Sequence, residues 1–209
     1  MVKLVDGICS TAMTPLFTRA KMGKGYELDI ILLASMFKKI TAIDDINVRQ
    51  RSVKIDNFVE AFLKKKPNAI IGNFGCGFCT RFWRIDNGEV KWVNFDLQGI
   101  IDLRDEFFPK EDRVKDFKCN FKVEKLSIVF DLIIAEGLFP YLPKDSSLKH
   151  ISSEAIFDLS EKGTGKNFVW PYTGEDIKGL KIHSKEKFGA SGRPVWLLHA
   201  EPERHDVSL

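Results

Sequence analysis

The spacing of apolar residues along the chain changes near residue 67. The part before it predicts helices, one over roughly residues 26–43 and a clearer one that ends at Pro67-Asn68. The clearer helix carries apolar side chains at i, i+3, i+4, i+7 and i+8, namely Ile55, Phe58, Val59, Phe62 and Leu63. Residues 1–66 are therefore expected to form an N-terminal helical cap.

After residue 67 the apolar residues gather in short runs typical of buried strands. The expected strands are residues 69–71, 90–96, 127–135, 155–159, 168–170, 179–183 and 194–199, and a helix is expected near residues 100–108. Alternating strands and helices predict an α/β fold with a mostly parallel sheet and helices on both faces. Gly189 and Gly192 separate the last two strands, which favours an antiparallel pair that closes the sheet.

Composition and charge indicate a single globular domain and argue against a nucleic-acid-binding protein. The chain has 209 residues, of which 44% are hydrophobic and 29% charged, which suits a single domain over residues 1–209. The net charge of +3 is spread along the chain without a basic stripe, so no nucleic-acid partner is expected. The lysine run at residues 64–66 is interpreted as the solvated end of a helix.

Compartment and membrane association are also predicted from the sequence. No apolar run approaches the roughly 20 residues of a membrane span, and the N-terminus lacks a secretory signature. The four cysteines, Cys9, Cys76, Cys79 and Cys119, are too few and scattered for a disulfide framework. These features predict a cytoplasmic protein without a membrane partner.

The main chemical signal is a glycine loop, Gly75-Cys76-Gly77, directly after an expected strand. Glycines there allow the backbone to approach a ligand closely. Asp96 follows Gly75 by 21 residues and ends the next strand, where a carboxylate can accept both hydroxyls of a ribose. Position 80 is Thr where a dinucleotide fingerprint has a third small residue, which favours S-adenosylmethionine over a dinucleotide. The alternative is a tight turn with Asp96 as a helix cap.

Several blocks, in order, resemble the leucine carboxyl methyltransferase family, which includes polyketide O-methyltransferases of the tetracenomycin type. The blocks are Thr11-Ala12 with Arg19-Ala20, Arg51-Ser-Val-Lys-Ile-Asp56, Phe74-Gly-Cys-Gly-Phe-Cys-Thr-Arg81, Trp92-Val-Asn-Phe-Asp96-Leu97, and Ile134-Ala-Glu-Gly137 with Tyr141-Leu142. The resemblance implies a class I methyltransferase, with a Rossmann-like core over residues 67–209, that transfers a methyl group from S-adenosylmethionine to oxygen.

The resemblance also implies roles for individual residues. Gly75, Cys76 and Gly77 would line the methionine part of the cofactor, and Asp96 with Leu97 would hold the ribose. Glu136 would lie beside the amino group. Arg51 would bind a carboxylate of the cofactor or the substrate, as would Arg19, because a guanidinium grips a carboxylate through two bonds. Asp116 and Asn120 are both candidates for the adenine contact. Tyr141 would face the acceptor, whereas Trp92 and Phe95 are candidate walls of the cofactor site.

The acceptor is expected to be a small molecule that carries a carboxylate or a phenolic hydroxyl. A carboxylate is ionised at neutral pH and needs no base, whereas a phenol, with a pKa near 10, would need one. Tyr141 and His150 are the distant candidates for that base. The sequence indicates neither the oligomeric state nor a metal site.

Departures from the family pattern leave two other functions open. Cys79 stands where the family has Asp, residues 116–127 form a short loop, and the region after Leu142 is shorter than in typical members. A catalytically inactive homologue that binds the cofactor or a partner is one alternative. Cys76 and Cys79 also form a CxxC pair ahead of an expected helix, so a thiol redox protein is the other.

Overall fold

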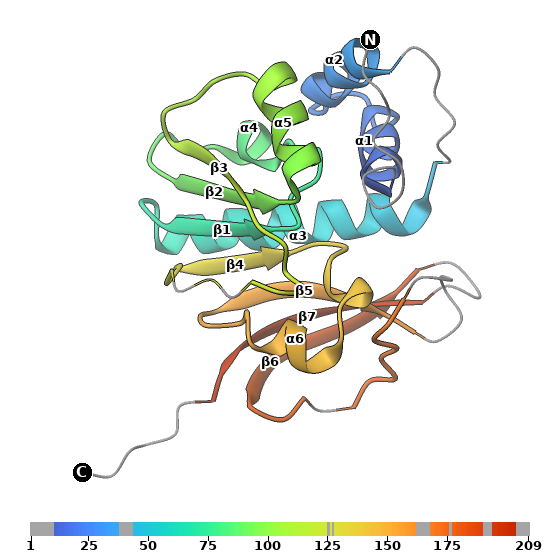
Figure 1. Ribbon diagram of the computed structural model, residues 1–209, viewed down its shortest axis with the longest axis vertical. Helices are drawn as coiled ribbons and strands as arrows, with labels where there is room; N and C mark the ends of the chain where they lie inside the picture. The colour runs from blue at the N-terminus through green and yellow to red at the C-terminus, as the bar shows by residue number, and fades with distance from the viewer. Residues whose placement is uncertain are drawn as a thin grey trace.

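The computed structural model describes residues 11–37, 44–124, 126, 128–161, 168–175, 177–189 and 194–203. Its centre is a sheet of seven strands in the order β3-β2-β1-β4-β5-β7-β6 (Figure 1). The strands are β1 (Ile70–Phe74), β2 (Lys91–Asp96), β3 (Val114–Lys118), β4 (Leu132–Ala135), β5 (Ala155–Ser160), β6 (Leu180–Phe188) and β7 (Val195–Pro202). The neighbours among β1 to β5 pair in parallel, whereas β7 is antiparallel to both β5 and β6. The expected α/β fold with an antiparallel C-terminal pair is confirmed.

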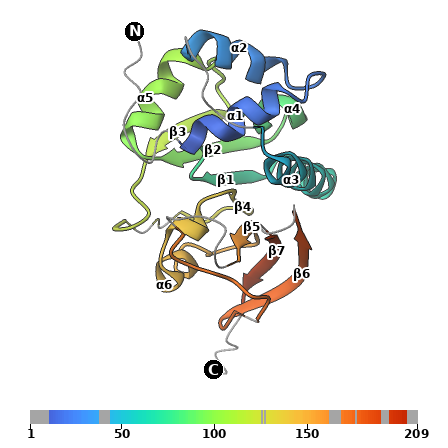
Figure 2. The same ribbon diagram turned by 90° about the vertical axis from the view of Figure 1, so that its right-hand side faces the viewer.

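Helices cover both faces of the sheet (Figure 2). They are α1 (Met13–Ala20), α2 (Glu27–Met36), α3 (Ile46–Lys65), α4 (Arg81–Ile85), α5 (Gln98–Phe107) and α6 (Lys144–Leu148), with a 3₁₀ turn, η2 (Phe139–Tyr141). The apolar face expected of α3 packs Ile55, Val59 and Leu63 against β1, β2 and β4. Asp45 caps α3 by accepting a hydrogen bond from the Asn47 amide at 2.9 Å. The other face carries an aromatic core built around Phe74, Phe95, Phe121, Phe130 and Phe157.

The structure corrects several expected boundaries. The strand expected at residues 127–135 begins only at Leu132, because Phe130 turns inward and packs on Gly72. A Cβ at Gly72 would lie 2.8 Å from the Phe130 ring. Residues 168–170 form no strand, and only Pro171 makes an isolated bridge, to Ser160. The helix expected over residues 26–43 ends at Met36, and residues 38–43 lie outside the described part of the chain.

The apolar pattern of the sequence does not predict strand β3, for a physical reason. β3 lies at the edge of the sheet and its residues are exposed or half-buried, so its sequence shows no apolar run. By contrast, all residues of β4 and β5 are buried, and both were visible in the sequence. Among the described residues, no helix is long and apolar enough to cross a membrane.

Candidate functional site

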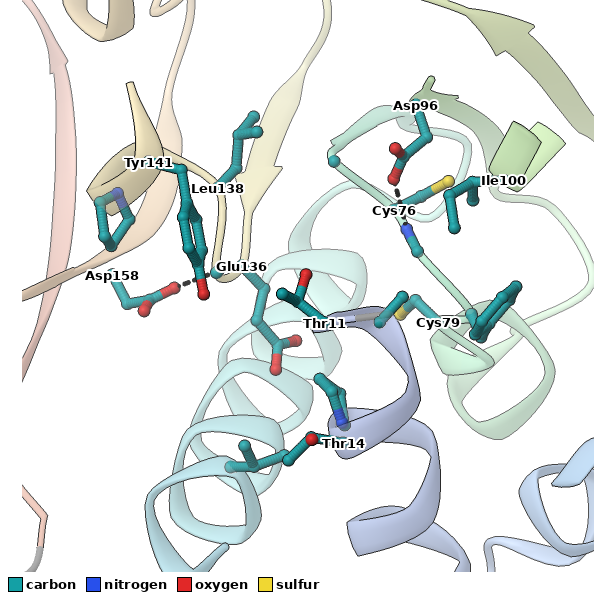
Figure 3. A pocket seen from close by; sticks show the side chains of 18 of the residues that line it. Thr11, Thr14, Cys76, Cys79, Asp96, Ile100, Glu136, Leu138, Tyr141 and Asp158 are labelled. Carbon is teal, nitrogen blue, oxygen red and sulfur yellow. Dashed lines mark hydrogen bonds between the residues drawn. The ribbon is translucent and has the colours of Figure 1, made fainter. Parts of the chain in front are cut away.

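A cavity of about 580 Å³ opens at the carboxyl ends of the parallel strands. Its lining includes ten of the residues that the sequence singled out for binding, namely Arg19, Arg51, Gly75, Cys76, Gly77, Asp96, Leu97, Asn120, Glu136 and Tyr141. Figure 3 shows Asp96 at one end of this cavity, with Glu136, Tyr141 and Asp158 at the other. The fold therefore brings these residues together, and their individual roles stay predictions.

The glycine loop needs glycine at both positions. Gly75 and Gly77 have φ angles of +63° and +49°, in the left-handed region that side chains rarely adopt. A Cβ at Gly75 would lie 3.0 Å from Leu138, and one at Gly77 would lie 3.3 Å from the Cβ of Ala12. The loop is thus closely packed against Leu138 and Ala12, and its residues form part of the cavity wall.

Asp96 is fastened to this loop. Its Oδ2 accepts a hydrogen bond from the Gly77 amide at 2.7 Å, and its Oδ1 accepts one from the Leu97 amide at 2.7 Å. Burial raises the pKa of Asp96, and the two amide bonds act in the opposite direction. α5 has Leu97 at its N-cap and no side-chain cap, so Asp96 does not cap that helix in the usual way. Each carboxylate oxygen retains acceptor capacity for a further donor.

The opposite end of the cavity is a chain of arginines and carboxylates. Glu136 accepts hydrogen bonds from Arg51 Nε at 3.0 Å and from Arg81 Nη2 at 2.6 Å. Arg51 Nη1 also donates to Asp158 Oδ2 at 2.9 Å, and Asp158 Oδ1 accepts from the Gly137 amide at 2.5 Å. Burial alone would raise the pKa of Glu136, but the two arginines outweigh it and hold that pKa well below its usual range. Glu136 is therefore ionised at neutral pH.

The sequence does not predict two residues of this ion-pair network, Arg81 and Asp158, as site residues. Arg81 is fully buried and bridges Glu136 to Asp56, whose Oδ1 accepts from Arg81 Nε at 2.5 Å. Arg81 is the last residue of the block Phe74–Arg81 that resembles the family, and this position is the feature of the sequence that could have indicated its role. Asp158 lies inside the wholly buried strand β5. A charged residue within an apolar run is rarely buried without a partner, and this feature of the sequence could have indicated its role.

Arg19 lines the cavity, but its guanidinium makes hydrogen bonds within the protein. Its Nε donates to Asp29 Oδ1 at 2.7 Å and its Nη2 donates to the Phe78 carbonyl at 2.7 Å, with only 3% of the residue exposed. These two bonds occupy Nε and Nη2, and the expected contact of Arg19 with a ligand carboxylate stays a prediction. The fork already holds Asp29 and the glycine loop.

The structure separates the two candidates for the adenine contact. Asn120 lines the cavity, whereas Asp116 points into the protein, where it accepts from Arg104 Nε at 2.7 Å and from Asn94 Nδ2 at 2.7 Å. Trp92, expected as a possible wall, is buried in the core and donates from Nε1 to Asn94 at 3.0 Å. Phe95 likewise lies in the aromatic core and outside the lining.

The end of the cavity near Tyr141 has aromatic and apolar walls. Tyr141 and Phe168 make an edge-to-face contact at 5.0 Å between ring centroids, and Pro140, Leu138 and Leu142 also line the cavity. Burial raises the pKa of Tyr141, so its phenol stays protonated at neutral pH and can donate a hydrogen bond. His150, a candidate base, lies outside the lining and its Nε2 bonds the Phe121 carbonyl at 3.0 Å.

The first cysteine of the CxxC pair, Cys76, lacks the features of a reactive thiol. Cys76 is buried and burial raises the pKa of its thiol well above the usual range, whereas a redox pair needs a lowered pKa. Cys79 is half-buried, and its Sγ lies 3.6 Å from Arg81 Nη1. No cluster of three or more metal-binding side chains occurs among the described residues.

The chain is similar to known proteins both in sequence and in fold. A tetracenomycin polyketide synthesis O-methyltransferase from Streptomyces glaucescens is 30% identical over 193 residues, covering 74% of this chain and 72% of that protein. A probable leucine carboxyl methyltransferase 1 from Caenorhabditis briggsae is 31% identical over 78 residues, covering 35% of this chain and 24% of that protein. No family model matches the chain.

Two solved structures share the fold at low sequence identity. Magnesium protoporphyrin IX methyltransferase from Synechocystis, with bound S-adenosylhomocysteine, has a TM-score of 0.57 at 12% identity and covers 93% of this chain and 100% of that one. The N-methyltransferase NodS from Bradyrhizobium japonicum, also with S-adenosylhomocysteine, has a TM-score of 0.57 at 13% identity and covers 85% of this chain and 97% of that one.

Proposed function

The chain belongs to the family of S-adenosylmethionine-dependent O-methyltransferases that includes the tetracenomycin type, and from this premise we propose that the 580 Å³ cavity binds S-adenosylmethionine and a small acceptor whose oxygen becomes methylated. The observation that carries the proposal is the convergence of the glycine loop, Asp96, Glu136 and Arg51 on that one cavity. Its volume lies within the range of roughly 300–1,000 Å³ typical of small-molecule pockets.

The residues at the two ends of the cavity fit the two ends of the cofactor. The carboxylate of Asp96 can accept bonds from vicinal ribose hydroxyls, and the side-chain amide of Asn120, which lines the same cavity, can hydrogen-bond adenine. At the other end, Glu136 offers a carboxylate to an ammonium group and Arg51 offers a guanidinium to a carboxylate. Both are engaged with each other, so the amino-acid part of the cofactor would insert beside an existing ion pair and share its charges.

The chain's own residues contribute positioning and exclusion of water. When bound, S-adenosylmethionine supplies an electrophilic methyl group on a positively charged sulfur. The glycine loop brings backbone close to the ligand, and the apolar walls at Leu138, Pro140 and Phe168 exclude water from the acceptor end. Holding an acceptor oxygen near attack distance is worth a large part of such a barrier. Tyr141 can orient that oxygen by donating a hydrogen bond.

The state of the carboxylates supports an acceptor that is already ionised. Two arginines hold Glu136 and keep its pKa low, so Glu136 is a poor base. Burial raises the pKa of Asp158, but its oxygens already accept hydrogen bonds from Arg51 and the Gly137 amide. Tyr141 keeps its own proton at neutral pH because burial raises its pKa. A carboxylate, or a phenol acidic enough to ionise by itself, is therefore the acceptor class that the cavity fits.

Calorimetric titration of the folded protein with S-adenosylmethionine and S-adenosylhomocysteine tests the proposal. The Asp96→Ala variant should lose affinity by about tenfold or more, since hydrogen bonds to a charged group contribute about 1.5–3 kcal/mol. Asp86→Ala is the matched control, because Asp86 pairs with Arg113 outside the cavity lining. Failure of the folded wild-type protein to bind either compound would overturn the proposal. Binding would justify a search for methyl transfer among small carboxylates and acidic phenols.

A further inference from the structure

The glycine loop continues through residues 78 and 79, and the three successive carbonyl groups of residues 77–79 are each bound by a buried arginine. Arg104 Nη1 donates to the Gly77 carbonyl at 3.1 Å and to the Cys79 carbonyl at 3.2 Å. Between them, the Phe78 carbonyl accepts from Arg19 Nη2 at 2.7 Å. We propose that Arg19 and Arg104 are positioning residues that together hold the loop in its ligand-binding shape. This rests on the proposed function only in taking the loop as the cofactor-binding element.

Both arginines are buried in the protein interior and paired with a carboxylate. Arg104 lies on α5, is 1% exposed, and pairs through Nε with Asp116 on β3 at 2.7 Å. Arg19 lies on α1 and pairs through Nε with the fully buried Asp29 on α2 at 2.7 Å. Burying a guanidinium is costly unless it is paired and hydrogen-bonded. Each pair is neutral as a unit, and Arg104 Nη1 and Arg19 Nη2 donate to main-chain carbonyls. Among the described residues, Arg104 Nη2 is buried without a hydrogen-bond partner.

Amides of the loop donate hydrogen bonds to groups other than the two arginines, so both the amides and the carbonyls of the loop are restrained. The Gly77 amide donates to Asp96, the Cys76 amide donates to the Phe95 carbonyl at 3.1 Å, and the Cys79 amide donates to the Cys76 carbonyl at 2.9 Å. Gly77 itself has a φ of +49°, a conformation that glycine leaves easily because it has no Cβ. The arginine contacts restrain that freedom and fix how Gly77 presents its amide to Asp96.

Arginine suits this task better than lysine for a geometric reason. Arg104 reaches Asp116 and two loop carbonyls at once with one planar group, and its guanidinium also lies 4.1 Å from the centre of the Phe108 ring. An ammonium is a compact point charge with three donors and cannot span those partners in the same way. A lysine at either position would therefore keep the charge and lose the restraint.

Hydrogen exchange of the ligand-free protein tests the proposal without any cofactor. In Arg104→Lys and Arg19→Lys, amides of residues 75–79 should exchange about tenfold faster or more, from the loss of hydrogen bonds to a charged group. Amides of β5 and β7 should keep their wild-type rates. The neutral double variant Arg104→Met/Asp116→Leu removes the arginine without leaving a buried carboxylate unpaired. Arg113→Met is the control, because it loses an ion pair with Asp86 away from the loop.

Affinity for S-adenosylhomocysteine is the second readout, measured where each variant is folded. Both lysine variants should bind about tenfold more weakly, whereas Arg113→Met should bind as the wild type does. Unchanged loop exchange in both lysine variants would overturn the proposal. A wild-type protein that binds no S-adenosylhomocysteine, yet whose loop exchanges faster in the lysine variants, would overturn the proposed function and leave the positioning role standing.

Discussion

Replacing Glu136 by Gln should destabilise the protein strongly although the two side chains have the same shape. Glu136 lies between Arg51 and Arg81, with 10% of its side chain exposed. Gln removes the negative charge and can place an NH₂ group against an arginine donor. Removing one partner of a buried ion pair costs about 3–5 kcal/mol, because the opposite charge stays buried and uncompensated. Asp158 and Asp56 remain as partners of the two arginines, which places the expected loss near the lower end.

The destabilisation should depend on pH in a defined direction. The folded-state pKa of Glu136 is lowered from 4.5, so its contribution is complete above the unfolded pKa and is lost as pH falls through the folded pKa. At pH 4 the unfolded state already binds protons, which reduces the wild-type advantage by about 0.8 kcal/mol relative to pH 7. Urea unfolding of both proteins between pH 4 and pH 7 measures this difference.

An exposed pair provides the control for this experiment. Glu186 pairs with Lys54 at 2.6 Å, but 56% of the Glu186 side chain is exposed, so Glu186→Gln should change the unfolding free energy by at most about 1 kcal/mol. If Glu136→Gln cost no more than Glu186→Gln, or if its effect did not shrink toward pH 4, the assigned role of the buried pair would be wrong.

Three further substitutions or reagents probe other parts of the site. Gly75→Ala should abolish measurable binding of S-adenosylhomocysteine, because the φ of +63° and the 3.0 Å approach to Leu138 leave no room for a Cβ; wild-type affinity would contradict this. Iodoacetamide at pH 7.5 should label Cys79 before Cys76, whose thiol is buried with a raised pKa, as peptide mass spectrometry can establish. Phe157→Ala should lower the unfolding free energy by about 3–5 kcal/mol, since Phe157 is fully buried, and urea titration measures it.

The sequence predicted the parts of the site that obey local rules. A glycine at a strand end that must adopt a positive φ, such as Gly75 or Gly77, is visible because few other residues could serve there. Asp96 was visible because a carboxylate at the end of the next parallel strand must meet the same edge of the sheet. Both inferences need only the order of elements along the chain.

The partners of the charged residues could not be predicted in the same way. Arg51 reaches Glu136 and Asp158 across 85 and 107 residues of sequence, and no spacing rule connects such positions. Arg19 holds Asp29 and a loop carbonyl, two partners that its sequence position does not predict, because its side chain is buried between helices and the loop. Pairing among buried charges is decided by which side chains packing leaves within about 3 Å of each other.

The same division holds for the fold. Apolar periodicity by itself determined α3 and the parallel strands with buried faces, since each must hide a recognisable set of side chains. The short glycine-containing connection between the last two strands predicted the closing antiparallel pair. Only the tertiary structure decided that β3 exists, because an edge strand gains its pairing from β2 and needs no apolar run. It also decided that Phe130 leaves β4 to pack on Gly72, a contact that depends on two distant segments meeting in space.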